Sequence, residues 1–160
     1  NHESYSRGET FVTRKITLFV AKYNKSKKGT LYLGNLSSKR DWGYAGDYVE
    51  GMWKIIQHSK ANDFVLATGK SYSVRDFLRE AFRCININII FKGKNSKEVG
   101  IDSKTKKIIV KSIPYYYRPN EVTNLVGDYS KAKKLLKWKP KTNFKELVKM
   151  MVESDIKECS

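Results

Sequence analysis

The sequence predicts an α/β fold, because strand-like and helix-like stretches alternate along its 160 residues. Residues 63–69, DFVLATG, form an apolar run that stops at a glycine, which is typical of a buried strand. Two later segments open with a helix N-cap residue, Ser73 or Asn143, followed three positions on by a carboxylate. These observations indicate a chain with a packed core and no internal repeat.

In the first part of the chain, residues 10–23 place Phe11, Leu18 and Phe19 at helical spacing, which predicts an amphipathic helix. The lysine-rich stretch 22–29 ends this helix at a glycine. TLYLGN at 30–35 predicts a short strand that runs into a turn. Residues 40–59 predict a turn and then a helix, whose apolar face is expected to comprise Tyr48, Met52, Ile55 and Ile56.

In the second part, Ser73 is the expected N-cap of a helix, with Asp76 completing a capping box. The alternation in 86–91 predicts a strand, 93–107 predicts polar turns, and 107–114 predicts another strand. Pro119 suits the first turn of a helix, and 130–137 predicts a short helix. Asn143 and Glu146 predict the cap of the last helix. Its apolar stripe is expected to comprise Phe144, Leu147, Val148, Met151 and Val152.

The net charge of +16 is compatible with binding to nucleic acid or to an anionic surface. Most of the basic residues are lysines, however, whereas sequence-reading proteins favour arginine for bidentate contacts. These lysines spread over 22–28, 92–111 and 131–141. A solvated basic surface is therefore the preferred interpretation, and nucleic acid is an unlikely partner. No apolar run approaches the roughly 20 residues that cross a bilayer, so no membrane partner is expected.

Cys84 and Cys159 are the only cysteines. Their spacing matches neither a zinc site nor a redox pair, so no metal is expected. Cys84 lies in an apolar stretch and is expected to be a buried thiol, and Cys159 an incidental surface thiol. Two unpaired cysteines fit a reducing compartment, and the predicted location is cytoplasmic.

No nucleotide-binding or hydrolase motif of the GxGxxG, P-loop, HExxH or GxSxG type is present. His58 is expected on the surface, and no spacing supports a catalytic triad built on His2. Arg7, Arg40 and Arg118 stand beside aromatic residues or expected helix starts, which suits bidentate phosphate binding. Pairing of Arg40 with Asp41 and of Arg118 with Glu121 explains two of them equally well, and the residues alone leave both interpretations open.

Five blocks occur in the order found in the GDP-mannose 4,6-dehydratases, a family of extended short-chain dehydrogenases/reductases. They are NHESYSRGETFVTRKIT, LYLGNLSSKRDWGYAGDYVEGMW, DFVLATGKSYSVRDF, YYRPNEVTNLVGD and KAKKLLKWKP. The chain resembles the C-terminal part of these enzymes from end to end. The resemblance implies that 1–160 is the C-terminal segment of a NAD(P)-binding Rossmann enzyme, mainly its GDP-sugar-binding domain. It also implies that 62–69 is a late Rossmann strand whose neighbours lie upstream.

The resemblance assigns roles to individual residues. It places His2 and Arg7 at the NADP cofactor, and Arg40 and Arg118 as a clamp on the diphosphate of GDP-mannose. The remaining substrate-binding residues that it implies are Asn1, Val12, Lys15 and Glu121. Physical chemistry agrees for the clamp, because planar guanidinium donors match phosphate oxygens better than lysine does.

The implied reaction removes a hydride from C4 of the mannose, eliminates water across C5 and C6, and returns the hydride to C6. The catalytic Thr, Glu and Tyr-xxx-Lys of the family have no counterpart here, so no catalytic residue is assigned and the segment alone is expected to be inactive. The complete enzyme is expected to be a lyase of GDP-fucose biosynthesis and a homo-oligomer. The alternatives are a truncated, non-catalytic nucleotide-sugar-binding module, or a related nucleotide-sugar dehydratase or epimerase.

The sequence departs from the family pattern at four positions. Tyr5 and Ser6 replace a Pro and an Arg, and Tyr115 replaces an Arg. Lys137 replaces a Gly before Trp138, where a left-handed helix cap is expected to strain a lysine.

Overall fold

The computed structural model describes residues 1–118, 122 and 124–159, and it confirms the mixed α/β class. The α-helices are α1 (Val12–Ser26), α2 (Ala45–Ile56), α3 (Val74–Arg83), α4 (Ser130–Leu136) and α5 (Phe144–Glu158). The strands are β1 (His2–Glu3), β2 (Leu31–Leu33), β3 (Lys39–Arg40), β4 (Gly43–Tyr44), β5 (Tyr72–Ser73), β6 (Ile89–Lys92), β7 (Val99–Asp102) and β8 (Ile108–Ser112). Two single turns of 3₁₀-helix, η1 (Asn95–Lys97) and η2 (Pro114–Tyr116), complete the elements. None of the helices in the described ranges has the length and apolar character needed to cross a membrane.

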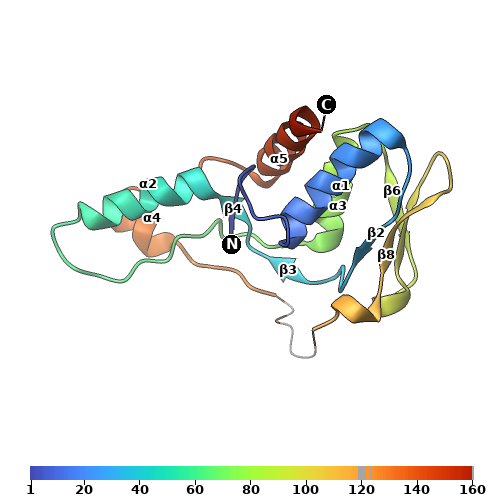
Figure 1. Ribbon diagram of the computed structural model, residues 1–160. Coiled ribbons are helices and arrows are strands. Elements are labelled where there is room, and N and C mark those ends of the chain that lie inside the picture. Colours follow the sequence, from blue (N-terminus) through green and yellow to red (C-terminus); the bar gives the residue numbers. More distant parts are fainter. Residues whose placement is uncertain (119–121, 123, 160) are drawn as a thin grey trace.

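The main body consists of a four-stranded sheet with three helices on one side (Figure 1). Its strand order is β2-β8-β7-β6, with β2 parallel to β8 and the other pairs antiparallel. Helices α1 and α3 pack against this sheet, and α5 packs on α1 and α3. Val20, Phe77 and Leu147 of these helices are fully buried in the shared core. Two short strand pairs form separate two-stranded sheets: β1 pairs with β4 in parallel, and β3 pairs with β5 antiparallel.

A smaller apolar cluster joins α2 and α4 beside the main body (Figure 1). Tyr48 of α2 packs against Trp138, whose indole N–H donates to the Asp47 carbonyl at 2.8 Å. The predicted apolar face of α2 is wrong in part, because Met52 is 43% exposed and Ile56 is 79% exposed. The helix is apolar on two sides, and helical spacing alone does not tell which side α4 covers.

Capping explains why α3 and α5 begin where the sequence predicts. The Ser73 hydroxyl accepts from the Asp76 N–H at 3.1 Å, and the Asp76 carboxylate accepts from the Ser73 N–H at 3.0 Å. Asn143 and Glu146 form the same reciprocal pair, with distances of 3.0 Å and 2.9 Å. Each pair satisfies two backbone N–H groups that a helix start would otherwise leave unpaired. The predicted stripe of α5 is buried at all five positions.

Residues 62–69 form no strand, although their pattern predicts one. The backbone N–H groups of Thr68 and Gly69 donate instead to the side chain of Asp41, at 2.9 Å and 3.0 Å. Val65 is 51% exposed, so only part of this run is covered within the described residues. The assignment of the segment to a Rossmann sheet stays a prediction.

Two smaller expectations also need correction, and a third falls partly outside the described residues. The polar stretch 93–107 contains β7, which is hidden in the sequence because Gly100 and Asp102 interrupt its apolar pattern. Cys84 is exposed rather than buried, because it lies at the C-cap of α3, after the last buried residue of that helix. Pro119 lies outside the described residues, and no helix is present in 124–129.

Lys137 ends α4 with a left-handed backbone, at φ 52° and ψ 31°. This conformation brings Cβ close to a carbonyl oxygen and costs an L-residue about 1–2 kcal/mol, whereas glycine adopts it readily. We expect Lys137→Gly to raise the free energy of unfolding by about 1 kcal/mol, measured by urea denaturation. Lys137→Ala is the control, because it shortens the side chain but keeps Cβ, and it should bring no gain. An equal gain from alanine would show that the side chain, not the backbone, is responsible.

Candidate functional site

A cavity of about 520 Å³ opens between the start of α1, the loop 34–40 and the end of the 3₁₀ turn η2. This size suits a small organic ligand. The wall combines polar and apolar residues, as is usual where a ligand must be both buried and oriented. The lining residues are Asn1, Glu3, Arg7, Thr10, Phe11, Val12, Thr13, Lys15, Leu33, Gly34, Asn35, Ser38, Arg40, Trp42, Val74, Tyr116 and Arg118.

The charge around this cavity is strongly positive. Arg7, Lys15, Arg40 and Arg118 all line it, and Glu3 is the one acidic residue among the described residues of its wall. The cavity also meets the N-terminus of α1, where Val12 and Thr13 belong to the first turn. Unpaired N–H groups and the helix dipole favour an anion at such a position. The site is therefore built for a negatively charged ligand.

Aromatic rings hold two of these cations in place. The Arg7 guanidinium carbon lies 3.5 Å from the centre of the Phe11 ring, and the Lys15 ammonium lies 3.9 Å from the centre of the Tyr116 ring. Both distances are within the range of cation–π attraction, which is worth about 0.5–1 kcal/mol at exposed sites. These contacts limit the motion of two long side chains before any ligand arrives.

Glu3, on strand β1, is buried against the first turn of α1. Its carboxylate accepts a hydrogen bond from the Thr13 hydroxyl at 2.5 Å and lies 3.4 Å from Nε of Arg7. Only 2% of the residue is exposed, and this burial raises the pKa of the Glu3 carboxyl despite the two partners. The Glu3 carboxylate therefore contacts both Arg7 and the first turn of α1, and it holds them close together.

The raised pKa predicts a pH effect on stability. Between about pH 4.3, where an unfolded Glu titrates, and the higher folded pKa, the folded chain keeps a proton that the unfolded chain has released. Stability contributed by this group therefore falls as pH rises through that window. Glu3→Gln lacks this titration. We therefore expect the free energy of unfolding of the variant, relative to that of the parent, to increase as pH rises.

Urea denaturation from about pH 4 to about pH 8 checks this expectation. Thr13→Val is the matched variant, since it removes the hydrogen bond that opposes the effect of burial. It should widen the window and steepen the loss of stability. A constant difference between Glu3→Gln and the parent at every pH would contradict the assignment.

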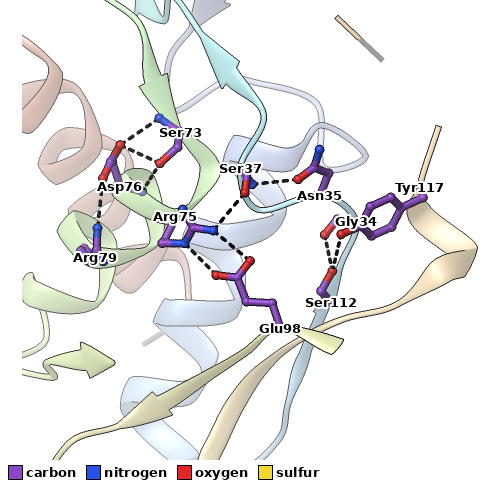
Figure 2. A network of polar contacts seen from close by, with 10 residues as sticks. All are labelled: Gly34, Asn35, Ser37, Ser73, Arg75, Asp76, Arg79, Glu98, Ser112 and Tyr117. Atoms are coloured by element: carbon purple, nitrogen blue, oxygen red, sulfur yellow. Dashed lines mark hydrogen bonds and ion pairs between the residues drawn. The ribbon is translucent and has the colours of Figure 1, made fainter. Parts of the chain in front are cut away.

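The loop 34–38, which forms one wall of the cavity, is fixed by a polar network that Figure 2 shows. Arg75 of α3 binds Glu98 through two contacts, at 2.7 Å and 2.9 Å, and donates to the Ser37 hydroxyl at 3.0 Å. On the other side, the Ser112 hydroxyl of β8 donates to the Gly34 carbonyl at 2.7 Å. Paired guanidinium–carboxylate contacts of this kind are the strong class of hydrogen bonds. The wall is thus held from both α3 and the sheet.

The structure brings together most of the residues that the sequence singles out. Asn1, Arg7, Val12, Lys15, Arg40 and Arg118 line the same cavity, although their positions span more than a hundred residues of sequence. His2 does not line it, and its ring instead meets Tyr48 edge to face, with centroids 4.5 Å apart. Partial burial and the nearby charge of Arg7 lower the pKa of His2. Glu121 lies outside the described residues.

Sequence reasoning misses several residues of the wall. Glu3, Thr13 and Tyr116 contribute to the site, yet none is named by spacing or by composition. The one signal for Glu3 is its position between His2 and Arg7, which the resemblance singles out. Pairing of Asp41 with Arg40 is one of the two interpretations that the residues leave open, but the Asp41 carboxylate accepts from the backbone of two other segments.

Comparison with known proteins agrees with the residue blocks and with the fold. The chain matches the family model described as "GDP-mannose 4,6 dehydratase" over residues 1–151. It is 54% identical to the GDP-mannose 4,6 dehydratase of Dictyostelium discoideum over 156 residues, which cover 98% of this chain and 44% of that protein. The chain thus spans less than half the length of the curated relatives it matches.

Two solved structures show the same fold. RMD from Pseudomonas aeruginosa, complexed with NADPH, has a TM-score of 0.78 at 12% identity and covers 99% of this chain and 46% of its own. A dTDP-glucose 4,6-dehydratase from Bacillus anthracis, in complex with NAD, has a TM-score of 0.67 at 12% identity and covers 100% of this chain and 43% of its own. At such identities these structures speak for the fold only. The family model and the close relative decide the assignment: the chain belongs to the GDP-mannose 4,6 dehydratase family.

Proposed function

We propose that this chain supplies the substrate-binding part of an enzyme that converts GDP-mannose to GDP-4-keto-6-deoxymannose. The observation that supports this most is the cavity beside α1, where the described residues of the wall include four cations and one buried carboxylate. A nucleoside diphosphate sugar carries about two negative charges on its diphosphate, and paired guanidinium groups match its oxygens. The membership in the dehydratase family then selects GDP-mannose among such ligands.

In this proposal Arg40 and Arg118 bind the diphosphate from two sides, and Lys15 and Asn1 bind neighbouring polar groups of the nucleotide. Val12 and Phe11 supply apolar surface at the N-terminus of α1. These residues bind and orient the sugar nucleotide. No proton transfer is assigned to them, because the described residues of the cavity offer no group positioned as a general base except the already bonded Glu3.

The cofactor in this proposal is NADP, and the chemistry that it supplies when bound is hydride removal from C4 and hydride return to C6, with loss of water across C5 and C6 between them. Arg7 and His2 are the residues of this chain proposed to lie toward it. The Arg7 guanidinium fits a phosphate or ribose oxygen of such a group, because its side chain remains 25% exposed beside the cavity. One structural relative contains NADPH and another contains NAD, so NAD is the alternative cofactor. A homo-oligomeric, cytoplasmic enzyme stays a prediction.

A chimera tests the proposal. This chain replaces the matching segment of the Dictyostelium discoideum relative, which is 54% identical to it. We expect the chimera to turn over GDP-mannose with NADP, and to leave dTDP-glucose and UDP-glucose unchanged. A folded, cofactor-loaded chimera that binds GDP without turnover would favour the non-catalytic binding module. Turnover of another nucleotide sugar would favour a related dehydratase or epimerase.

A further inference from the structure

Asp41 stands at a junction of three chain segments that are far apart in sequence. It follows Arg40 at the end of β3, and only 5% of it is exposed. Its Oδ1 accepts from the Thr68 N–H at 2.9 Å and from the Thr68 hydroxyl at 2.5 Å. Its Oδ2 accepts from the Gly69 N–H at 3.0 Å and from the Gly127 N–H at 3.2 Å. A carboxylate has about four acceptor positions, and all of them are occupied here.

The same junction also touches the cavity wall. The Asp41 carbonyl accepts from the Asn1 side-chain amide at 3.3 Å. Nη1 of Arg40 donates to the Val122 carbonyl at 2.6 Å and to the Lys39 carbonyl at 2.7 Å. The Arg40 guanidinium therefore contacts the backbone of residue 122, and the carboxylate of the next residue, Asp41, contacts the backbone of residue 127.

Close packing strengthens this attachment at Gly127. A Cβ built on Gly127 would lie 2.4 Å from the Cβ of Ala67, which is far inside the contact distance of two carbon atoms. The absence of a side chain lets the backbone reach both Ala67 and the Asp41 carboxylate. The backbone at Gly127 is thereby fixed against Ala67, next to the Asp41 carboxylate.

We propose that Asp41 is a positioning residue for the diphosphate site, an inference that rests on the function proposed above. Its carboxylate sets the relative placement of Arg40, of Asn1 and of the backbone at Gly127. Two guanidinium groups bind a diphosphate well only if their spacing is fixed before the ligand arrives. Asp41 itself touches neither substrate nor cofactor in this proposal.

The test uses Asp41→Asn in the chimera. The substitution keeps the shape of the side chain, but it replaces one acceptor oxygen with an amide that only donates. In either orientation of the amide, two donors lose their acceptor. We expect the KM for GDP-mannose and the Kd for GDP to rise about tenfold together, with the KM for NADP changed less than about twofold.

Asp47→Asn is the matched control. Asp47 is also buried, at 6% exposure, and its carboxylate accepts the N–H groups of Lys141 and Thr142 at 3.0 Å and 2.8 Å. It does not line the cavity. Its substitution should lower the melting temperature as Asp41→Asn does, but it should leave the KM for GDP-mannose unchanged. Equal rises in KM for both variants would mean a general structural effect and would overturn the proposal.

A double-mutant cycle with Arg40→Ala separates positioning from simple destabilisation. If Asp41 acts through Arg40, the double variant Asp41→Asn/Arg40→Ala should have a KM for GDP-mannose less than about three times that of Arg40→Ala alone. Multiplication of the two single effects would reject the proposal. Should Asp41→Asn fail to fold, Thr68→Val removes a single hydroxyl bond to the same carboxylate, and it should raise KM about threefold. An inactive parent chimera would instead reject the proposed function.

Discussion

Removal of the Arg14 guanidinium is expected to lower the free energy of unfolding by about 3–5 kcal/mol. Arg14 lies on α1 with 8% of its side chain exposed, and its Nη2 lies 2.9 Å from Oδ1 of Asp155 on α5. The Asp155 side chain is fully buried, so Arg14→Ala leaves a carboxylate in the core without its ionic partner. Helices α1 and α5 run side by side (Figure 1), so loss of this ion pair weakens a helix–helix contact of the main body.

The pH dependence of this variant follows from the same geometry. Burial already raises the pKa of Asp155, and loss of the Arg14 charge raises that pKa further. Protonation then relieves the buried charge, so the deficit of Arg14→Ala should shrink as pH falls from about 7 to about 5. Urea denaturation at both pH values measures it. A deficit that grows toward acid would contradict the assignment.

Two further variants distinguish a lost ion pair from lost packing. Arg83→Ala removes an arginine that is 65% exposed and pairs with Glu80 on the same helix, and it should cost less than about 0.5 kcal/mol. Arg14→Met combined with Asp155→Leu removes both buried charges and keeps the volume, so it should recover most of the stability. If the double variant is as unstable as Arg14→Ala, packing rather than charge accounts for the loss.

Local rules predict the helices better than they predict the strands. Ser73 with Asp76 and Asn143 with Glu146 fix helix starts through contacts three residues apart, so the sequence contains the whole interaction. A strand depends on a partner elsewhere in the chain. Strand β7 forms because β6 and β8 flank it, although its own pattern is poor. Residues 62–69 have a good pattern and form no strand, and the N–H groups of Thr68 and Gly69 donate to Asp41 instead.

The candidate site shows the same division. The residue types and the family resemblance predict which arginines matter, and the cavity gathers Arg7, Arg40 and Arg118. Neither source assigns a role to Arg14 or predicts the backbone contacts of Asp41, since each makes its decisive contacts with residues far along the chain. A buried charge is visible in a sequence only through its partner, and the partner is known only after folding.

Arg40→Ala and Arg118→Ala in the chimera are each expected to raise the KM for GDP-mannose about 10- to 100-fold. Hydrogen bonds to a charged group contribute about 1.5–3 kcal/mol each, and about 1.4 kcal/mol corresponds to a factor of ten. The KM for NADP should stay nearly constant, because the proposed cofactor residues are Arg7 and His2. Steady-state kinetics with each substrate varied in turn measures both effects.

Arg79→Ala is the control for loss of an arginine as such, since Arg79 is 45% exposed on α3 and does not line the cavity. Arg40→Lys adds a finer test, because it keeps the charge but loses the planar fork, and its KM should fall between those of the parent and Arg40→Ala. An unchanged KM in both alanine variants would remove the diphosphate clamp from the proposal.

The division of the effect between KM and kcat carries further information. The diphosphate lies outside the C4–C6 region where bonds change, so its contacts should stabilise bound substrate and transition state equally. Loss of such uniform binding raises KM and leaves kcat unchanged. A fall in kcat of similar size would mean that the arginines also hold the sugar in its reactive orientation. In that case the placement of Arg40 by Asp41 would bear on the chemical step as well as on affinity.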